Sequence, residues 1–463
     1  MARLITLILF GLLIAACSPS QTAFVATQPP TATVPVFTVT PTFSPVPTRT
    51  LTPTPAPTET FTPTPTATPT ETLTPTTVPT QRLLTLTPPS REGAPAAFSG
   101  ATPIFAATEG WSCGDFPCAD DLRGYQRRIS VPEGFEISFV GRFPGQVQQI
   151  AYGNDGRLYA TVLERGSRMG AVYVLEGETP VRYSGDLISP LGLAFQPGTN
   201  ELYVSGRTTL EQGGSLWHIP AGGGDAATII SDLPCCYSLI DNQPNGMIFG
   251  PDGFLYLGVG SRSDHGEPPE GSRLQVAAIE PFEAAVLRIQ PHTGEIETFA
   301  SGLRNPFDIT FSSSGQFYVT DVGTVSGIGD RIVALESGGF YGFPYWRARG
   351  CERCPVSTGS LRPLPDLIAL TPFTLPRGLV SYTGTQFPVN FFDTLFVSLW
   401  NAVEGGQQII HIDPARAGSD GYQPQPFVTG LIRPTDVILD PDGALVIADY
   451  VYGHIWRVSY TGS

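Results

Sequence analysis

Few side chains in this sequence could take up a proton near neutral pH. Of the five histidines, His265 has the most polar surroundings, in the segment Ser263-Asp264-His265-Gly266-Glu267. A histidine beside an acid could act as a general base, and Asp241, further upstream, is a second candidate. The competing interpretation is that His265 is a structural residue of a surface loop. Strand or turn positions, and hence structural roles, are predicted for His218, His292, His411 and His454.

The basic residues restrict the chemistry further, because all 26 Lys+Arg positions are arginine. The lack of lysine excludes a P-loop lysine, a Schiff-base lysine and a lysine general base. A bound anion must therefore be held by arginine side chains or by backbone N–H groups. The formal net charge of -15, without a basic cluster, argues against nucleic acid as a partner.

The seven cysteines comprise one residue near the amino terminus and three close pairs. These pairs are Cys113 with Cys118, Cys235 with Cys236, and Cys351 with Cys354. In an exported protein such pairs predict disulfides that staple loops. A redox or zinc pair at Cys351 and Cys354 is the alternative, although no second pair of ligands has a suitable spacing. The adjacent Cys235 and Cys236 allow either a vicinal disulfide or two buried thiols.

The amino terminus has the pattern of an export signal. Arg3 precedes an apolar run that is too short to span a bilayer and that ends in Ala15-Ala16-Cys17. Small residues followed at once by cysteine are similar to the bacterial lipoprotein box, in which the cysteine is lipidated after cleavage. We therefore predict a signal peptide over residues 1–16, a lipidated Cys17 and an extracytoplasmic protein that contacts the membrane through its lipid only.

Residues 17–110 are dominated by threonine and proline and carry little charge. Such a segment cannot bury a core, so we predict that it is disordered. Proline favours extended conformations, and the segment would act as a stalk. The folded domain is expected over residues 111–463.

The remaining sequence repeats a strand, a tight turn and a second strand. In one copy, Met247-Ile248-Phe249 is followed by the turn Pro251-Asp252-Gly253 and by Leu255-Tyr256-Leu257. The glycine supplies the positive φ that such hairpin turns require. A third apolar strand follows each pair, beginning at residues 172, 216, 286, 332, 409 and 455, so the spacings are 44, 70, 46, 77 and 46 residues.

Six units of several strands each predict an all-β, six-bladed propeller with long insertions in two places. The strand Phe135-Glu136-Ile137-Ser138-Phe139 precedes the first unit, and we expect it to join the last blade and close the ring. The 51 glycines and 46 prolines, with only 14% charged residues, also favour turn-rich β structure. A β-helix or a β-sandwich is the alternative, but large insertions fit propeller loops better.

Several motifs occur in a characteristic order over about residues 131–463. They are Asn245-Gly246-Met247-Ile248-Phe249-Gly250-Pro251-Asp252-Gly253, Ala300-Ser301-Gly302-Leu303-Arg304-Asn305-Pro306, Gly338-Gly339-Phe340-Tyr341-Gly342 and Asp440-Pro441-Asp442-Gly443-Ala444-Leu445. This order resembles the soluble glucose/sorbosone dehydrogenases, which are six-bladed quinoproteins. The resemblance implies pyrroloquinoline quinone (PQQ) and calcium over the central channel, with a histidine that takes the proton of a sugar hydroxyl while hydride passes to the quinone.

The resemblance also implies roles for individual residues. Arg304 and Asn305 match the motif that lines the quinone, and Arg433 matches an arginine of the last blade. The backbone carbonyls of Gly323 and Thr324 match the positions that bind the cofactor's calcium, an ion that takes oxygen ligands.

Several positions depart from the family pattern, and two of them bear on the proton acceptor and on the hold of the quinone. Asn242 stands where the family has its histidine, and an amide cannot act as a base near neutral pH; His265 and Asp241 are the replacement candidates. Gln408 stands where a lysine would clamp the quinone, in agreement with the lack of lysine in the chain.

The sequence thus supports two main hypotheses of function. The first is a PQQ- and calcium-dependent oxidoreductase that oxidises a sugar or polyol and passes electrons to an acceptor. The second is a catalytically degenerate propeller that binds a carbohydrate or a partner in the cell envelope. A metal-dependent lactonase-type propeller is a third, for which we identify no converging Glu, Asn and Asp ligands.

Overall fold

The computed structural model describes residues 117–236, 242–264, 266, 279–324, 329–344 and 363–462. All of them belong to the compact unit Arg82–Ser463. The predicted segments 1–16 and 17–110 therefore lie outside the described residues. So do the following predicted residues: Cys17, Cys113, Asp241, His265, Cys351 and Cys354.

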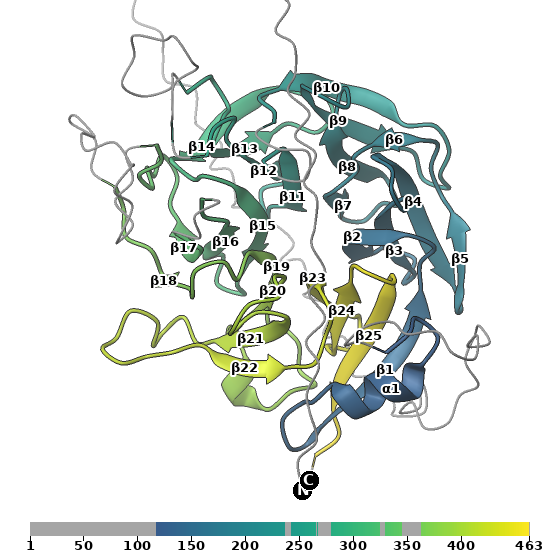
Figure 1. The fold of residues 1–463 in the computed structure, drawn as a ribbon. Helices are drawn as coiled ribbons and strands as arrows, with labels where there is room; N and C mark the ends of the chain where they lie inside the picture. Colours follow the sequence, from purple (N-terminus) through teal and green to yellow (C-terminus); the bar gives the residue numbers. More distant parts are fainter. Residues whose placement is uncertain are drawn as a thin grey trace, which may run out of the picture. The chain divides into compact units, whose positions relative to one another are not determined.

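The described residues form a six-bladed β-propeller, in which six antiparallel sheets surround a common centre (Figure 1). The first blade consists of β2 (Gln146–Tyr152), β3 (Leu158–Leu163), β4 (Met169–Glu176), β5 (Thr179–Arg182) and β6 (Leu187–Ile188). The second consists of β7 (Leu193–Phe195), β8 (Leu202–Arg207), β9 (Gly214–Ile219) and β10 (Ala227–Leu233). The third consists of β11 (Pro244–Phe249), β12 (Leu255–Val259), β13 (Ala285–Ile289) and β14 (Ile296–Ser301). This confirms the predicted all-β, six-bladed fold.

The other three blades follow in chain order. They are β15 (Pro306–Phe311), β16 (Phe317–Asp321), β17 (Arg331–Leu335) and β18 (Ile368–Ala369); β19 (Pro376–Ser381), β20 (Leu395–Leu399), β21 (Gln408–Ile412) and β22 (Gln425–Val428); and β23 (Pro434–Leu439), β24 (Leu445–Asp449), β25 (His454–Tyr460) and β1 (Phe135–Arg142). A 3₁₀-helix, Val389–Phe391, precedes β20. β1 pairs antiparallel with β25, from Phe135 opposite Tyr460 to Arg142 opposite His454.

The innermost strands are β2, β7, β11, β15, β19 and β23, and each contacts the next around the ring, including β23 with β2. Five of them are joined to the second strand of the blade by the predicted tight turns, and in three of these turns Gly156, Gly253 and Gly443 have positive φ values of 76°, 81° and 85°. The sixth, β19, is joined to β20 by the longer segment 382–394, which includes the 3₁₀-helix. We call the face that carries these turns the turn face. We call the opposite face, where the innermost strands begin, the site face.

The hydrophobic core is divided among the blade interfaces rather than gathered in one place. Each of six clusters joins two neighbouring blades, as when Leu216 of β9 and Leu257 of β12 share one cluster. Because both faces of each sheet pack against a neighbouring sheet, strands such as β3 and β8 are buried along their whole length.

A small or hydroxyl residue at the fourth position of the second strand links each of several blades to the next. Ser205 Oγ donates to the Asn245 carbonyl at 2.6 Å, and Thr320 Oγ1 donates to the Arg377 carbonyl at 2.8 Å. Thr161 makes the equivalent bond to the Leu191 carbonyl. At Gly258 a Cβ atom would lie 2.4 Å from the Pro306 carbonyl oxygen, so this position has no room for a side chain.

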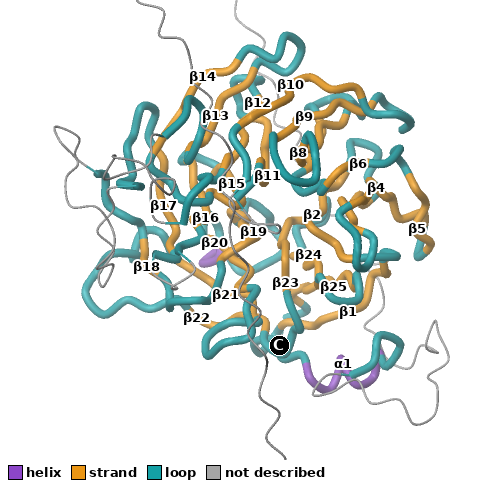
Figure 2. Tube along the Cα trace, turned by 45° about the horizontal axis from the view of Figure 1, so that its top comes forward, coloured by secondary structure: helices purple, strands orange, loops and turns teal. Residues whose placement is uncertain are grey.

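One described helix, α1 (Leu122–Arg128), lies beside the last blade (Figure 2). Its N-cap Asp121 accepts a bond from the Gly124 N–H at 2.8 Å. Tyr125 packs edge-on against His454 with ring centroids 4.9 Å apart, and His454 Nε2 donates to the Ala119 carbonyl at 2.7 Å. Within the described residues, no helix has the length and apolar character needed to cross a membrane.

Candidate functional site

The residues singled out by the motifs lie where innermost strands begin or second strands end. Asn242 and Arg304 precede β11 and β15, whereas Ser261 and Asp264 follow β12, and Thr324 follows β16. Because the two strands of each pair are antiparallel, the start of one lies beside the end of the other. The fold therefore brings these residues to the site face.

Arg304 is the centre of a buried network at this face. Its Nη2 donates to Asp264 Oδ1 at 2.6 Å, and its Nε donates to the Asp264 carbonyl at 3.0 Å. The two side chains are only 3% and 1% exposed. A charge-assisted pair of this kind holds the guanidinium in one orientation, because both partners have left water.

Asn242 is fixed by the same network. Its Oδ1 accepts a bond from Arg304 Nη1 at 3.3 Å, and its Nδ2 donates to Ser261 Oγ at 3.0 Å. Ser261 Oγ in turn donates to the Ser263 carbonyl at 2.6 Å. Both ends of the Asn242 amide are therefore engaged, and the side chain is buried. An amide in this position can orient neighbours but cannot accept a proton.

Asn305 lies beside Arg304 and is held through its main chain. Its backbone N–H donates to Asp321 Oδ1 at 2.8 Å, and Asp321 Oδ2 accepts bonds from Arg331 Nε at 2.9 Å and Nη2 at 2.8 Å. Asn305 Oδ1 accepts a bond from Asn245 Nδ2 at 2.7 Å. Among the described residues, the buried Nδ2 of Asn305 has no hydrogen-bond partner.

Arg433 takes part in an aromatic cluster that the motifs did not reveal. Its guanidinium lies 4.1 Å from the ring centroid of Trp400, and that of Arg377 lies 4.4 Å from the same ring. Arg377 also lies 4.7 Å from the centroid of Phe307. We call Arg377, Trp400 and Arg433 the Trp400 cluster. The signals in the sequence were a tryptophan directly after β20 and an arginine in Pro376-Arg377-Gly378.

The predicted calcium-binding main chain lies next to a buried acid. The Gly323 N–H donates to Asp330 Oδ1 at 2.8 Å, and the Leu375 N–H donates to Asp330 Oδ2 at 2.9 Å. Burial raises the pKa of Asp330 to about 6, although both hydrogen bonds oppose this shift. In the part of the chain that the structure describes, no group of three or more His, Cys, Asp or Glu side chains could hold a metal ion.

Gln408 is the first residue of β21, and its Nε2 donates to the Gly405 carbonyl at 2.7 Å within the preceding loop. The side chain that lies beside the Arg433 guanidinium is that of Trp400. The histidine His218 bonds Glu201 with 2.6 Å between Nε2 and Oε2. Burial lowers the pKa of His411 and brings that of His454 to about 4. These strand positions fit the structural roles expected for His218, His411 and His454.

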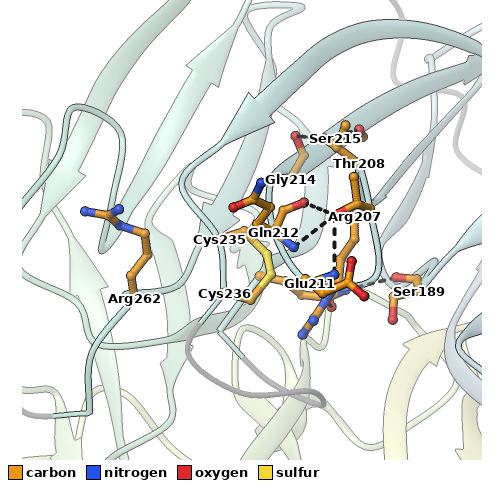
Figure 3. The surroundings of a disulfide bond; sticks show 12 residues. Ser189, Arg207, Thr208, Glu211, Gln212, Gly214, Ser215, Cys235, Cys236 and Arg262 are labelled. Carbon is orange, nitrogen blue, oxygen red and sulfur yellow. Dashed lines mark hydrogen bonds between the residues drawn. A yellow bond between two sulfur atoms is a disulfide. The ribbon is translucent and has the colours of Figure 1, made fainter. Parts of the chain in front are cut away.

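Cys235 and Cys236 form a vicinal disulfide, the first of the two alternatives that the sequence left open. Figure 3 shows the two sulfur atoms near Arg207, the last residue of β8, and near Glu211 and Gln212 of the loop that follows it. Arg207 Nε donates to Gln243 Oε1 at 2.7 Å, and Gln243 directly follows Asn242. Cys118 is also disulfide-bonded.

Comparisons with known proteins place this site in context. Residues 240–457 match the family model described as Glucose / Sorbosone dehydrogenase. An uncharacterized protein of Borreliella burgdorferi is 26% identical over 361 residues, which cover 72% of this chain and 91% of that protein.

Solved structures agree in fold. The PQQ-bound aldose sugar dehydrogenase of Streptomyces coelicolor is 17% identical, with a TM-score of 0.52 over 71% of this chain and 99% of that one. The soluble aldose sugar dehydrogenase of Escherichia coli in its apo form is 15% identical, with a TM-score of 0.52 over 70% and 99% of the two chains. Residues 240–457 are thus similar to the Glucose / Sorbosone dehydrogenase family, and the solved structures agree with the six-bladed propeller fold.

Proposed function

We propose that this chain is an oxidoreductase of the glucose/sorbosone dehydrogenase type, which binds PQQ at the site face and oxidises a sugar or a polyol. The observation that carries this proposal is the Trp400 cluster, in which two guanidinium groups stack on one indole. Every polar side-chain atom of Arg377, Trp400 and Arg433 is a hydrogen-bond donor. The cluster therefore favours a ligand that is planar, anionic and rich in acceptors.

PQQ has these properties, because it is a planar quinone with carboxylate groups. Two buried donors at the site face, Asn305 Nδ2 and Trp400 Nε1, lack partners among the described residues. Quinone or carboxylate oxygens would satisfy them, and Arg433 and Arg377 would balance the charge. The residues thus fit the cofactor, which supplies a hydride acceptor when bound. Calcium would depend on main-chain oxygens at Gly323 and Thr324.

The proton of the substrate hydroxyl needs a different acceptor from the family histidine, because Asn242 occupies that position. Asp264 is the described carboxylate joined to Asn242 through a single side chain, Arg304. We assign the role of base to Asp264, with Asn242 and Arg304 orienting it. A carboxylate is in general a weaker base than an imidazole, so slow turnover is expected.

The test is to add PQQ, with and without calcium, to the purified full-length protein. Quinone absorbance and dye reduction are followed with a panel of aldoses and polyols. Asp264→Asn should retain quinone binding and lose dye reduction. Asp440→Asn is the matched control, because Asp440 also forms a buried ion pair, at 2.5 Å with Arg457, away from the site face. Absence of quinone binding at saturating PQQ would refute the proposal.

A second candidate function rests on the Asn242 amide, of which both ends are engaged. Because this amide cannot take up a proton, its presence favours a propeller that binds a carbohydrate or a partner in the cell envelope without turnover. Binding of a sugar in calorimetry, without dye reduction in the presence of PQQ, would select this alternative. Equal dye reduction by the wild type and Asp264→Asn would instead retain the enzyme and remove Asp264 as its base.

We also propose that the protein is exported and anchored through a lipid on Cys17. The support comes from the sequence, in which Ala15-Ala16-Cys17 ends a short apolar run. Mass spectrometry of the mature amino terminus should find a modified Cys17, and Cys17→Ser should release the protein from the membrane fraction. An unmodified amino terminus at Met1 would contradict the proposal. Electron transfer would then go to an acceptor outside the cytoplasm.

A further inference from the structure

The turn face contains a cavity that is separate from the residues proposed to hold PQQ. It has a volume of about 450 Å³ and is lined by the innermost strands of all six blades. Cavities of this size accommodate small molecules. Most of the lining residues are apolar, and we call these the apolar wall; the polar ones include Gln149, Asn154 and Thr310. The wall includes Ile150, Phe195, Met247, Phe249, Val380 and Leu439.

The lining of this cavity includes two buried acids at equivalent positions in two blades. Asp308 is the third residue of β15, and Asp436 is the third residue of β23. Asp308 Oδ2 accepts a bond from the Leu379 N–H at 2.7 Å, and Asp436 Oδ2 accepts one from the Ile150 N–H at 2.7 Å. Each carboxyl group thus bonds the main chain of the next blade.

Glycines make room for these acids at the centre of the ring. A Cβ atom on Gly246 would lie 2.5 Å from Asp308 Oδ1 and 2.8 Å from Gln149 Nε2. A Cβ atom on Gly378 would lie 2.5 Å from Asp436 Oδ1. The Gln149 amide also bonds the Asp308 carboxylate. The absence of two side chains therefore leaves space in which three polar side chains meet the cavity.

The two acids have no cationic partner within the described residues, since the hydrogen bonds that their carboxyl groups accept come from backbone N–H groups and from Gln149. Burial raises the pKa of Asp308 to about 7, and burial with repulsion from Asp308 raises that of Asp436 well above its ordinary range. Tyr152 is the other titratable side chain in the lining. An ionised pair here is costly without a positive charge.

We propose that this cavity binds a monovalent organic cation with an apolar tail, its ammonium group at Asp308 and Asp436 and its tail along the apolar wall. Charge complementarity selects the ammonium, because a cation would compensate two buried carboxylates. The apolar wall selects the tail, because contact with the wall removes the hydrocarbon of the tail from water. This site does not depend on the proposed oxidoreductase function.

The probe is n-hexylammonium chloride, titrated into the full-length protein at pH 8.5 in a calorimeter, with n-hexanol as a neutral control of equal length. We expect hexylammonium to bind at least about tenfold more tightly than hexanol. The preference should weaken at pH 5, which is below the raised pKa of Asp308, while the amine keeps its charge. Equal affinity for the two probes, or no binding of hexylammonium, would overturn the proposal.

Variants locate the binding site. Asp436→Asn should weaken hexylammonium binding by about tenfold. The control Asp413→Asn removes an acid near the end of β21, outside the cavity, and should leave the affinity unchanged. If Asp436→Asn fails to fold, Ala151→Phe narrows the cavity while leaving both acids, and it should also weaken binding. Unchanged affinity in Ala151→Phe would refute this location.

Discussion

Arg304 Nη2 and Asp264 Oδ1 are 2.6 Å apart, in an ion pair that is almost completely removed from solvent at the site face. Arg304 precedes β15 and Asp264 follows β12, so the pair joins the third and fourth blades. It also connects the Asn242 amide to the proposed site. This relationship makes the pair both a structural link and part of the candidate chemistry.

Replacing one partner of this pair should destabilise the protein strongly. Arg304→Met leaves Asp264 buried without its cation, and we expect the free energy of unfolding to fall by about 3–5 kcal/mol. The control is Arg157→Met, which removes the exposed pair with Asp155, whose side chains are 40% and 23% exposed. That change should cost about 0–1 kcal/mol. Urea denaturation measures both, and similar losses would contradict the assignment.

The buried Asp308 of the turn-face cavity should make the stability of the protein depend on pH. The pKa of Asp308 rises from its ordinary 3.8 to about 7 in the folded state. The folded state therefore keeps a proton that the unfolded state releases, so the contribution of Asp308 to stability is fully present below about pH 4 and is lost as the pH rises through 7.

Asp308→Asn cannot ionise, and its melting temperature should fall less between pH 5 and pH 8 than that of the wild type. We expect a difference of about 2–4 °C, which corresponds to about 1 kcal/mol in a domain of this size. Differential scanning calorimetry at the two pH values provides the comparison. Parallel pH profiles for the two proteins would show that Asp308 does not titrate as described.

His454 should act in the opposite direction. Burial lowers its pKa from 6.5 to about 4, so the folded state holds a neutral ring. Its contribution is present above about pH 6.5 and is lost as the pH falls toward 4, because the unfolded state takes up the proton first. His454→Gln, which cannot take up this proton, should lose less stability than the wild type between pH 7 and pH 4.5. A thermal melt series tests this, and a steeper loss in the variant would disprove it.

The hydroxyl links between blades should contribute measurable stability. Thr320 Oγ1 donates to the Arg377 carbonyl at 2.8 Å and accepts a bond from the Asp308 N–H at 2.9 Å. Thr320→Val keeps the shape but leaves both backbone groups unpaired, which should cost about 1–3 kcal/mol. The control Thr293→Val affects an exposed turn, where Oγ1 accepts one bond of 3.3 Å from the Glu295 N–H. Chemical denaturation should separate the two, and equal losses would refute the link.

Much of the fold could be predicted from sequence because its units are local. Alternation of apolar residues and turns such as Pro251-Asp252-Gly253 specify a hairpin without reference to distant residues. Six such units, with spacings of 44–46 residues except where insertions lengthen two of them, then predict a propeller. Helix α1 and the short outer strands, such as β5 and β18, were not predicted. They are brief, and their stability comes from packing on neighbouring strands rather than from their own pattern.

The candidate site was predicted only in part. The sequence by itself determined which residue types were present, namely arginine without lysine and Asn242 at the position of the family histidine. Only the tertiary structure decided that Arg377 and Arg433 stack on one indole, Trp400, from neighbouring blades. It likewise decided that Asp308 and Asp436 share one cavity. Closure of the ring sets these distances, because residues far apart in the chain meet only where the innermost strands converge.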